Sequence, residues 1–413
     1  MEGNPRHCSL IRWSVASVLP ISRIEDHAMV IAPFRNRRPP AARLLGLAGI
    51  LLIWLATGLA RAEPYRWNIP DWAPPPAVPG DNPMNASKVE LGRRLFYDRR
   101  LSINGTISCA SCHRQDRAFT DGNQMSVGAT GQPGVRNAMS LTNVAFLSTL
   151  TWANPSLTRL ELQAIRPLLN QHPVEMGMYG KEPELIGKVA SDTDYPRLFR
   201  AAFPETKGRI DLSSIVRALA AFGRTLLSFN SAYDRYKFGG DASALSEAAR
   251  RGETLFFSDR FNCGRCHSGI NFTDSTYRGG PRPNAVFHNT GLYNVDGNGS
   301  YPKADGGLRI RTRAPGDEGR FRTPTLRNIA LTAPYMHDGS IATLPEVIRD
   351  HYAKGGMAAH VGQGASPLRN PLVAGFSISE AEIDELIAFL ESLTDHDFVT
   401  SEKFSDPFAA PRR

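Results

Sequence analysis

The sequence lacks three features that would place it in other classes of protein. Beyond residue 62 it has no apolar run of the roughly 20 residues that a bilayer span needs. It has no long low-complexity tract, and only five of its 413 residues are cysteine. Charged residues make up 21% and hydrophobic residues 41% of the chain. The sequence therefore predicts a globular protein long enough for two domains of ordinary size.

A strong net charge is also missing from most of the chain. The formal net charge is +8, but the first 62 residues hold eight arginines against three acidic residues, which is +5 of that total. The remaining residues therefore carry only +3. A chain this close to neutral offers no electrostatic basis for binding nucleic acid, and we expect no such partner.

The N-terminus has the pattern of a targeting segment. An arginine-rich stretch, Arg35–Arg43, precedes an apolar run over Leu44–Leu59, and Ala60–Ala62 resembles a cleavage site. The run is shorter than a bilayer span usually requires. Residues 1–62 are therefore predicted to be a cleaved signal segment that exports the protein to the periplasm, with a retained membrane anchor as the alternative and Met29 as an alternative start.

Apart from Cys8, every cysteine lies in one of two C-x-x-C-H motifs. The six residues are Cys109, Cys112, His113, Cys263, Cys266 and His267. In this motif two thiols bond to the two vinyl groups of one haem, and the histidine becomes the proximal ligand of the iron. Two disulfides, a zinc site and a redox C-x-x-C are the alternatives, but an adjacent histidine in both copies favours two covalently bound c-type haems.

The segments that precede the two motifs repeat one another. Leu91–Asp98 and Arg250–Asp259 are each predicted to form a short amphipathic helix that ends in a Leu-Phe-aromatic step, and a capping box at Ser87 and Glu90 is expected to open the first. Two copies of one helix–loop–haem unit predict a mainly α fold of two cytochrome-c-like domains, with long loops and little β structure.

The expected organisation along the chain follows from these motifs. We predict an N-terminal strap over residues 63–86, a first haem domain over 87–235, a second over 236–400 and a C-terminal tail over 401–413. Further helices are expected over Glu161–Leu169, over Leu212–Leu227, and from a capping box at Ser379 to Leu393.

Several motifs together resemble a known family. They are Leu95-Phe96-Tyr97-Asp98 with the first haem motif, Trp152, Pro173-Val174-Glu175-Met176-Gly177, the second haem motif, and Thr323–Asn328 running through Pro334–Gly339. From about Trp67 to Thr394 the chain resembles the bacterial di-haem cytochrome c peroxidases, especially their MauG-like branch. The resemblance implies that the first haem reacts with hydrogen peroxide and that the second takes part in electron transfer.

The resemblance also implies roles for particular residues. Glu175 matches the catalytic glutamate of the family, a carboxylate that moves a proton between the two peroxide oxygens. Trp152 matches a tryptophan that relays electrons between the haems, and Gln163 resembles a residue near the peroxide site. His337 is carried over as a supporting residue near the haems, whereas His172 is expected to be an ordinary surface histidine.

A calcium ion between the domains is a further implication of the resemblance. The matching positions are Asn137, Thr332 and Pro334. Asparagine would offer its side-chain oxygen and the other two residues their backbone carbonyls, which are the hard ligands that calcium prefers.

The distal sides of the two irons are where this chain departs from the best-known peroxidases of the family. Those enzymes often hold a histidine over the first haem until the second is reduced, but the matching loop, Thr120–Arg136, contains none. We therefore predict an open first haem that needs no reductive activation. The distal position of the second haem falls at His351, beside Tyr352. Because the MauG-like branch uses tyrosine, Tyr352 is the first choice and His351 the second, with Met336 and Met357 as outside candidates.

Three functions are compatible with these residues. The first is reduction of hydrogen peroxide to water with electrons from a small c-type cytochrome or a cupredoxin. The second is a MauG-like oxidation of residues of a partner protein, and the third is electron transfer without turnover. Glu175 and the missing distal histidine weigh against the third, because a carrier benefits from closed, six-coordinate irons. A homodimer is compatible with the resemblance.

Overall fold

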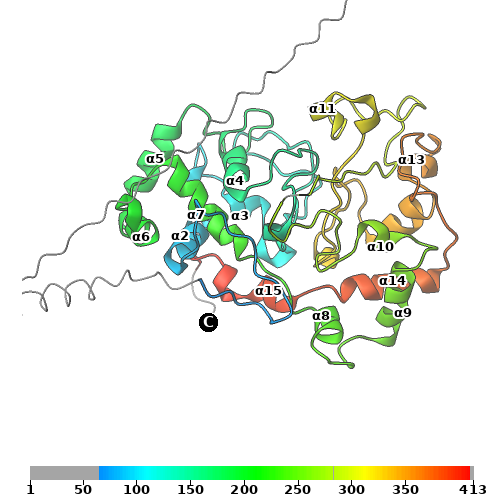
Figure 1. Cartoon of the computed structure of the whole chain (residues 1–413). Helices are drawn as coiled ribbons and strands as arrows, with labels where there is room; N and C mark the ends of the chain where they lie inside the picture. Colours follow the sequence, from blue (N-terminus) through cyan, green and yellow to red (C-terminus); the bar gives the residue numbers. More distant parts are fainter. Residues whose placement is uncertain (1–64, 282, 410–413) are drawn as a thin grey trace, which may run out of the picture. The chain divides into compact units, whose positions relative to one another are not determined.

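The computed structural model describes residues 65–281 and 283–409 (Figure 1). Within these ranges the regular structure is helical, and β pairing is limited to isolated bridges such as Tyr335 with Ile341. This confirms the mainly α class with little β structure. No helix in the described ranges is both long and apolar enough to cross a membrane. The predicted signal segment lies outside the described residues.

The α-helices are short and are separated by long loops. In chain order they are α2 (Ala86–Tyr97), α3 (Cys109–Cys112), α4 (Leu160–Leu169), α5 (Glu182–Ala190), α6 (Tyr195–Ala202), α7 (Leu212–Arg224), α8 (Ala232–Lys237), α9 (Glu247–Phe256), α10 (Cys263–Cys266), α11 (Arg309–Thr312), α12 (Leu344–Glu346), α13 (Met357–His360), α14 (Glu380–Glu391) and α15 (His396–Thr400). A π-helical turn, η8 (Val347–Tyr352), follows α12 directly.

The predicted helices are all present, but only α4 and α14 have their predicted bounds to within two residues, and one predicted cap is wrong. The bounds of α2, α7 and α9 differ from the prediction by three to five residues. The helix α2 begins at Ala86, and the side chain of Asn85 accepts a hydrogen bond from the backbone of Lys88. The capping box predicted at Ser87 is therefore wrong, because the helix has already begun one residue earlier. The capping box at Ser379 is confirmed, since Ser379 and Glu382 exchange both hydrogen bonds.

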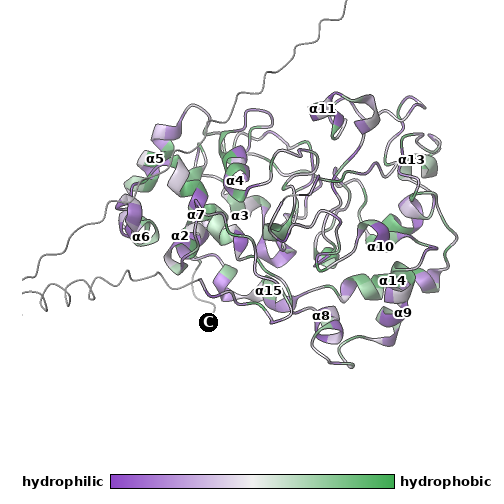
Figure 2. Ribbon diagram, in the orientation of Figure 1, coloured by the Kyte–Doolittle hydropathy of each residue, from purple (hydrophilic) through white to green (hydrophobic). Residues whose placement is uncertain are grey.

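Two separate hydrophobic cores are built around two helix crossings. In the first, α2 packs against α7 and buries Leu95 and Phe222, and in the second, α9 packs against α14 and buries Phe256 and Phe389. The two crossings are seen in Figure 1, and the apolar residues of these helices are green in Figure 2. Matching aromatic pairs close both crossings, with ring centroids 5.3 Å apart for Phe96–Phe222 and 5.1 Å for Phe256–Phe389.

A glycine at the same place in each repeat lets the helices approach so closely. A Cβ atom on Gly92 would overlap the backbone carbonyl of Ala218 in α7, and one on Gly252 would overlap the carbonyl of Glu385 in α14. Both glycines stand three residues before the Leu-Phe step of the repeat. The two units therefore share their packing as well as their motif.

The C-terminal segment returns to the first core. Phe398 of α15 and Phe404 pack in the cluster built on α2 and α7, although residues 236–400 were assigned to the second unit and 401–413 to a tail. The N-terminal strap also reaches across the chain, because the ring of Trp72 stacks on Phe238 with centroids 4.1 Å apart and meets Phe229 edge-on.

A buried polar junction joins the two units. Asn143 and Asn328 both adopt left-handed backbone conformations, with φ of 53° and 60°. The Asn143 amide donates to the side-chain oxygen of Asn271 at 2.9 Å, and the Asn328 amide donates to Thr142 at 3.2 Å. Each asparagine thus bonds a residue of the other unit, which ties the two haem motifs into one framework.

We expect Gly92→Ala and Gly252→Ala each to lower the free energy of unfolding by about 1–3 kcal/mol, because the added methyl group meets backbone that cannot move aside. The matched control is Gly223→Ala in α7, where the nearest atom to a new Cβ is 3.9 Å away. That substitution should be neutral or stabilising by up to about 1 kcal/mol, since alanine favours helix. Urea unfolding measures all three, and equal stability of the three variants would contradict the account.

Candidate functional site

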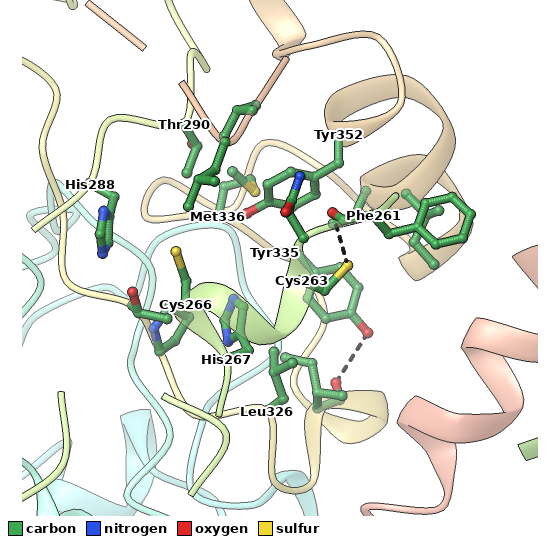
Figure 3. A pocket seen from close by; sticks show the side chains of 18 of the residues that line it. Phe261, Cys263, Cys266, His267, His288, Thr290, Leu326, Tyr335, Met336 and Tyr352 are labelled. Atoms are coloured by element: carbon green, nitrogen blue, oxygen red, sulfur yellow. Dashed lines mark hydrogen bonds between the residues drawn. The ribbon is translucent and has the colours of Figure 1, made fainter. Parts of the chain in front are cut away.

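The second C-x-x-C-H motif opens into a large apolar cavity. Its empty volume is about 1430 Å³, including the open mouth. One wall carries Cys263, Cys266 and His267, and the facing wall carries Met336 and Tyr352 (Figure 3). The rest of the lining is dominated by aliphatic and aromatic side chains. A flat, largely apolar group held by thiols and a histidine would fit this space.

The histidine of each motif is held in one tautomer by a backbone carbonyl. Nδ1 of His267 lies 3.0 Å from the carbonyl oxygen of Phe272, and Nδ1 of His113 lies 2.8 Å from that of Phe119. Because a carbonyl can only accept, each Nδ1 carries the proton and donates it. Each Nε2 is then left with a free lone pair, as an iron ligand requires.

Burial keeps both imidazoles neutral, since it lowers the pKa of His113 and of His267. The two phenylalanines whose carbonyls accept from the histidines have left-handed backbones, with φ of 62° at Phe119 and 49° at Phe272. The same local geometry therefore recurs at both motifs, and both histidines fit the role of proximal ligand.

The four motif cysteines are free thiols in apolar surroundings. Burial raises the pKa of Cys109 and of Cys263 to about 12. A redox C-x-x-C would instead need a lowered thiol pKa, and a structural zinc site would need several thiolates together. In the described part of the chain the one cluster of possible metal ligands joins Cys266 with Asp274 and His288. The thiols therefore fit bonding to haem vinyl groups better than they fit disulfides, zinc or thiol redox chemistry.

Glu175 faces the first motif from a loop that follows α4. Burial is the main cause of the raised pKa of the Cys109 and Cys112 thiols, and the negative charge of Glu175 adds to the rise at both, so the carboxylate lies within electrostatic reach of them. Two hydrogen bonds fix the loop: Met176 N–H donates to Pro167 at 2.9 Å, and Ala129 N–H donates to the Glu175 carbonyl at 2.7 Å.

Burial raises the pKa of the Glu175 carboxyl, and the positive charge of Arg166 opposes that rise only in part. On the same helix as Arg166, the Oε1 atom of Gln163 is buried without a hydrogen-bond partner from the chain. His172 is exposed on the neighbouring turn. The structure therefore provides a partly buried carboxylate at the first motif, together with an amide oxygen on α4 that has no hydrogen-bond partner.

Trp152 lies between two cavities. It lines the large cavity of the second motif, and it also lines a smaller one of about 510 Å³ that includes Thr120 and Met139 beside the first histidine. Its indole N–H donates to the carbonyl of Asn137 at 2.9 Å. This placement suits a group that links the surroundings of the two motifs.

The three residues expected to bind calcium come together in the smaller cavity. Asn137, Thr332 and Pro334 all line it, although Asn137 is nearly 200 residues from the other two in sequence. The amide nitrogen of Asn137 donates to the carbonyl of Asn123 at 2.9 Å, which orients the side chain. These residues offer oxygen atoms of the kind that calcium takes.

The candidates for the distal side of the second haem separate clearly. Tyr352, at the end of η8, lines the large cavity opposite the cysteines, and Met336 also lines it (Figure 3). His351 is fully buried outside the lining; its Nδ1 accepts a hydrogen bond from Met357 N–H at 2.9 Å, and burial lowers its pKa to about 3. Neither His351 nor Met357 is among the cavity residues.

Sequence reasoning missed Arg322, which lines both cavities. Its side chain is 2% exposed, and its hydrogen bonds go to the carbonyls of Thr151 and Thr323 at 3.3 and 3.0 Å, with no carboxylate among these partners. Burial lowers the pKa of this guanidinium to about 10. Its third side-chain contact is to the sulfur of Met139 at 3.5 Å, and the negative charge of Asp274 offsets burial only in part. A buried cation with no carboxylate in hydrogen-bond contact fits a ligand that brings carboxylates, as the propionates of haem do. No local motif reveals that burial.

His337 lines the large cavity and stacks face to face on Phe321, with ring centroids 3.7 Å apart. Burial lowers the pKa of His337 to about 4, so the ring is neutral. His337 therefore lies in the cavity of the second motif, where a supporting residue of the haem would lie.

Comparison with known proteins gives a consistent result. A family model described as di-haem cytochrome c peroxidase matches residues 86–243. The MauG protein of Methylophilus methylotrophus is 33% identical over 79% of this chain and 88% of its own length. A cytochrome c peroxidase of Pseudomonas sp. strain SCT is 34% identical over 91% of this chain and 99% of its own.

A solved structure gives the same picture. The crystal structure of a MauG-like protein associated with microbial copper homeostasis superposes with a TM-score of 0.80 and is 46% identical. The match covers 84% of this chain and all of that protein. The similarity therefore extends over both motifs and the junction between them.

We expect the purified protein to contain two covalent haems per chain. Replacing Cys109 and Cys112 with alanine should leave one, and replacing Cys263 and Cys266 should leave the other, because each pair holds a separate group. Pyridine haemochrome absorbance and intact mass measure the number directly. Full loss of haem from either double variant, or no loss, would contradict two independent attachment sites.

Proposed function

This chain belongs to the di-haem cytochrome c peroxidase family, and we propose that it reduces hydrogen peroxide to water with electrons from a small redox protein. Haem iron, when bound, supplies the electrons that split the O–O bond. The protein must then deliver and remove protons, exclude side reactions and connect the two haem sites. We assign the proton transfer to Glu175 and the connection between the two sites to Trp152.

The single observation that carries the proposal is the partly buried carboxylate of Glu175 beside the first motif. Splitting peroxide heterolytically requires a proton to leave one oxygen and to reach the other, and a carboxyl group within reach of both can move it. Burial raises the pKa of Glu175 above the ordinary value for glutamate, which makes this carboxylate a stronger proton acceptor than an exposed one. An electron carrier has no use for such a group.

The loop Thr120–Arg136 supports access of peroxide to the first site. It packs directly on the glutamate segment, because a Cβ atom on Gly128 would overlap the carbonyl of Val174, and it brings no histidine to the site. We therefore propose that the first haem is open in the fully oxidised protein and needs no prior reduction.

Trp152 is proposed to pass electrons between the sites. An indole that lines the surroundings of both motifs shortens the gap that each electron must cross. The electrons would come from a small c-type cytochrome or a cupredoxin in the periplasm, the compartment that the N-terminal leader and covalent haem attachment favour. A calcium ion held by Asn137, Thr332 and Pro334 would stabilise the cavity beside Trp152.

A second function is favoured by the position of Tyr352. A tyrosinate on the distal side of the second haem would stabilise the oxidised iron, which suits an enzyme that withdraws electrons from a partner protein. The similarity to MauG and to a MauG-like protein points the same way. Oxidation of a partner protein would use the same peroxide chemistry at Glu175 and differ only in the source of electrons.

We expect Glu175→Gln to slow peroxide reduction about 10²–10⁴-fold while leaving two haems bound, because the amide cannot take up the proton. The wild-type rate should rise with pH through a pKa above the ordinary value near 4.3 for glutamate, since only the ionised carboxyl accepts a proton, and that acid limb should vanish in the variant. Stopped-flow kinetics against pH test both points. The matched control is Glu205→Gln, which removes an exposed carboxylate; a similar loss there, or full activity of Glu175→Gln, would refute the assignment.

We expect Tyr352→Phe to change the visible and EPR spectra of one haem without loss of haem, because the phenol oxygen is removed from the distal side. Tyr335→Phe is the control, since Tyr335 lines the same cavity but its hydroxyl donates to the carbonyl of Ile329 at 3.2 Å. Unchanged spectra in Tyr352→Phe, together with a change in a His351→Gln variant, would transfer the role to His351.

A further inference from the structure

The segments that support the two histidine loops repeat one another, beyond the repeat that carries the motifs. Ser140-Leu141-Thr142-Asn143-Val144 in the first unit matches Thr325-Leu326-Arg327-Asn328-Ile329 in the second. Each copy places its asparagine in the left-handed conformation and then enters a 3₁₀ turn, η4 (Val144–Phe146) or η7 (Ile329–Leu331). The repeat is therefore one of conformation as well as of sequence.

The first residue of each copy carries a hydroxyl, which bonds a backbone carbonyl at the equivalent position of the histidine loop. The hydroxyl of Ser140 lies 2.6 Å from the carbonyl oxygen of Ala118, and that of Thr325 donates to the carbonyl of Asn271 at 2.6 Å. Ala118 and Asn271 immediately precede Phe119 and Phe272, whose own carbonyls accept from the two histidines. Each hydroxyl thus fixes the peptide next to the one that orients the histidine.

The two hydroxyls are themselves fixed in the same way. Ser140 accepts a hydrogen bond from the backbone N–H of Thr142 at 3.1 Å, and Thr325 accepts one from the N–H of Arg327 at 3.2 Å. Ser140 also contacts the hydroxyl of Thr142, with the two oxygens 2.8 Å apart. Because the Ala118 carbonyl can only accept, the single proton of Ser140 is directed to that carbonyl, and Thr142 donates to Ser140.

We propose that Ser140 and Thr325 are matched positioning residues, each of which sets the hydrogen bond of one motif histidine and thereby the reduction potential of the haem which that histidine serves. The inference rests on haem attachment at the two motifs and not on peroxidase activity. It extends to both haems, whatever reaction each of them supports.

The physical reason lies in the strength of the Nδ1–H···O bond. A carbonyl held in line with the Nδ1 proton makes the imidazole a more basic ligand, which stabilises the oxidised iron and lowers its potential. The left-handed backbone conformation is unfavourable for phenylalanine, so contacts from neighbouring residues have to maintain it. When the hydroxyl is removed, the loop carbonyl can rotate away, the bond to the histidine weakens, and the potential of that haem rises.

The test is a redox titration of the holoprotein with Ser140→Ala and Thr325→Val. We expect each variant to raise one of the two midpoint potentials, by up to about 59 mV, the one-electron equivalent of a tenfold change in the equilibrium constant. The two variants should move different midpoints, and the double variant should move both. Ser140→Thr and Thr325→Ser, which keep the hydroxyl, should restore the wild-type values.

Matched controls remove hydroxyls that bond helix carbonyls on the surface of each unit. They are Ser191→Ala and Thr254→Val. The two wild-type hydroxyls donate at 3.1 Å to the backbone carbonyls of Lys188 and Arg250, and neither substitution should change a midpoint potential. As a second measurement, NMR should show faster exchange with solvent of the Nδ1 proton of only the histidine whose hydroxyl is missing. The proposal is overturned if both variants move the same midpoint, if each moves both alike, or if neither potential and neither exchange rate changes.

Discussion

The hydrogen bond from a motif histidine to the carbonyl of a left-handed phenylalanine is the contact on which the rest of the structure depends. It selects the tautomer, leaves Nε2 available and fixes the plane of the ring relative to the two thiols. Because the same bond is made twice, the surrounding elements are also built twice. In the first unit, the helix crossing at Gly92 and the segment that begins at Ser140 lie around the bond of His113. In the second unit, the crossing at Gly252 and the segment that begins at Thr325 lie around the bond of His267.

The two copies nevertheless differ in what each adds to the shared frame. The first unit adds the loop with Glu175, whose carboxylate lies near the first pair of thiols. The second adds the π-helical turn that brings Tyr352 into the larger cavity. Trp152 and Arg322 lie where the two meet, and each lines both cavities. A symmetric scaffold therefore carries an asymmetric pair of sites.

Much of this arrangement could be predicted from the sequence, for reasons that differ from residue to residue. The thiols and histidines of the haem motifs are adjacent in sequence, so spacing alone indicates them. The amphipathic patterns locate the helices, with bounds that differ from the observed ones by up to five residues. Glu175 has no chemical signature of its own and depends on the resemblance of its surrounding motif to a family. Tyr352 and His351 are adjacent in a helical turn and therefore point in different directions. Which of them faces the cavity depends on the orientation of that turn, which the sequence does not give. Arg322, the hydroxyls of Ser140 and Thr325 and the return of Phe404 to the first core are tertiary contacts between distant segments, which no local pattern contains.

The claim that joins these observations is that peroxide reacts at an open first haem with Glu175 beside it. The most direct measurement adds hydrogen peroxide to the fully oxidised holoprotein without any reductant and follows the visible spectrum. The account predicts a prompt spectral change with consumption of peroxide, because nothing in the Thr120–Arg136 loop has to be displaced first. No reaction until one electron per protein has been supplied would contradict it and would show that another ligand closes the first haem in the oxidised state.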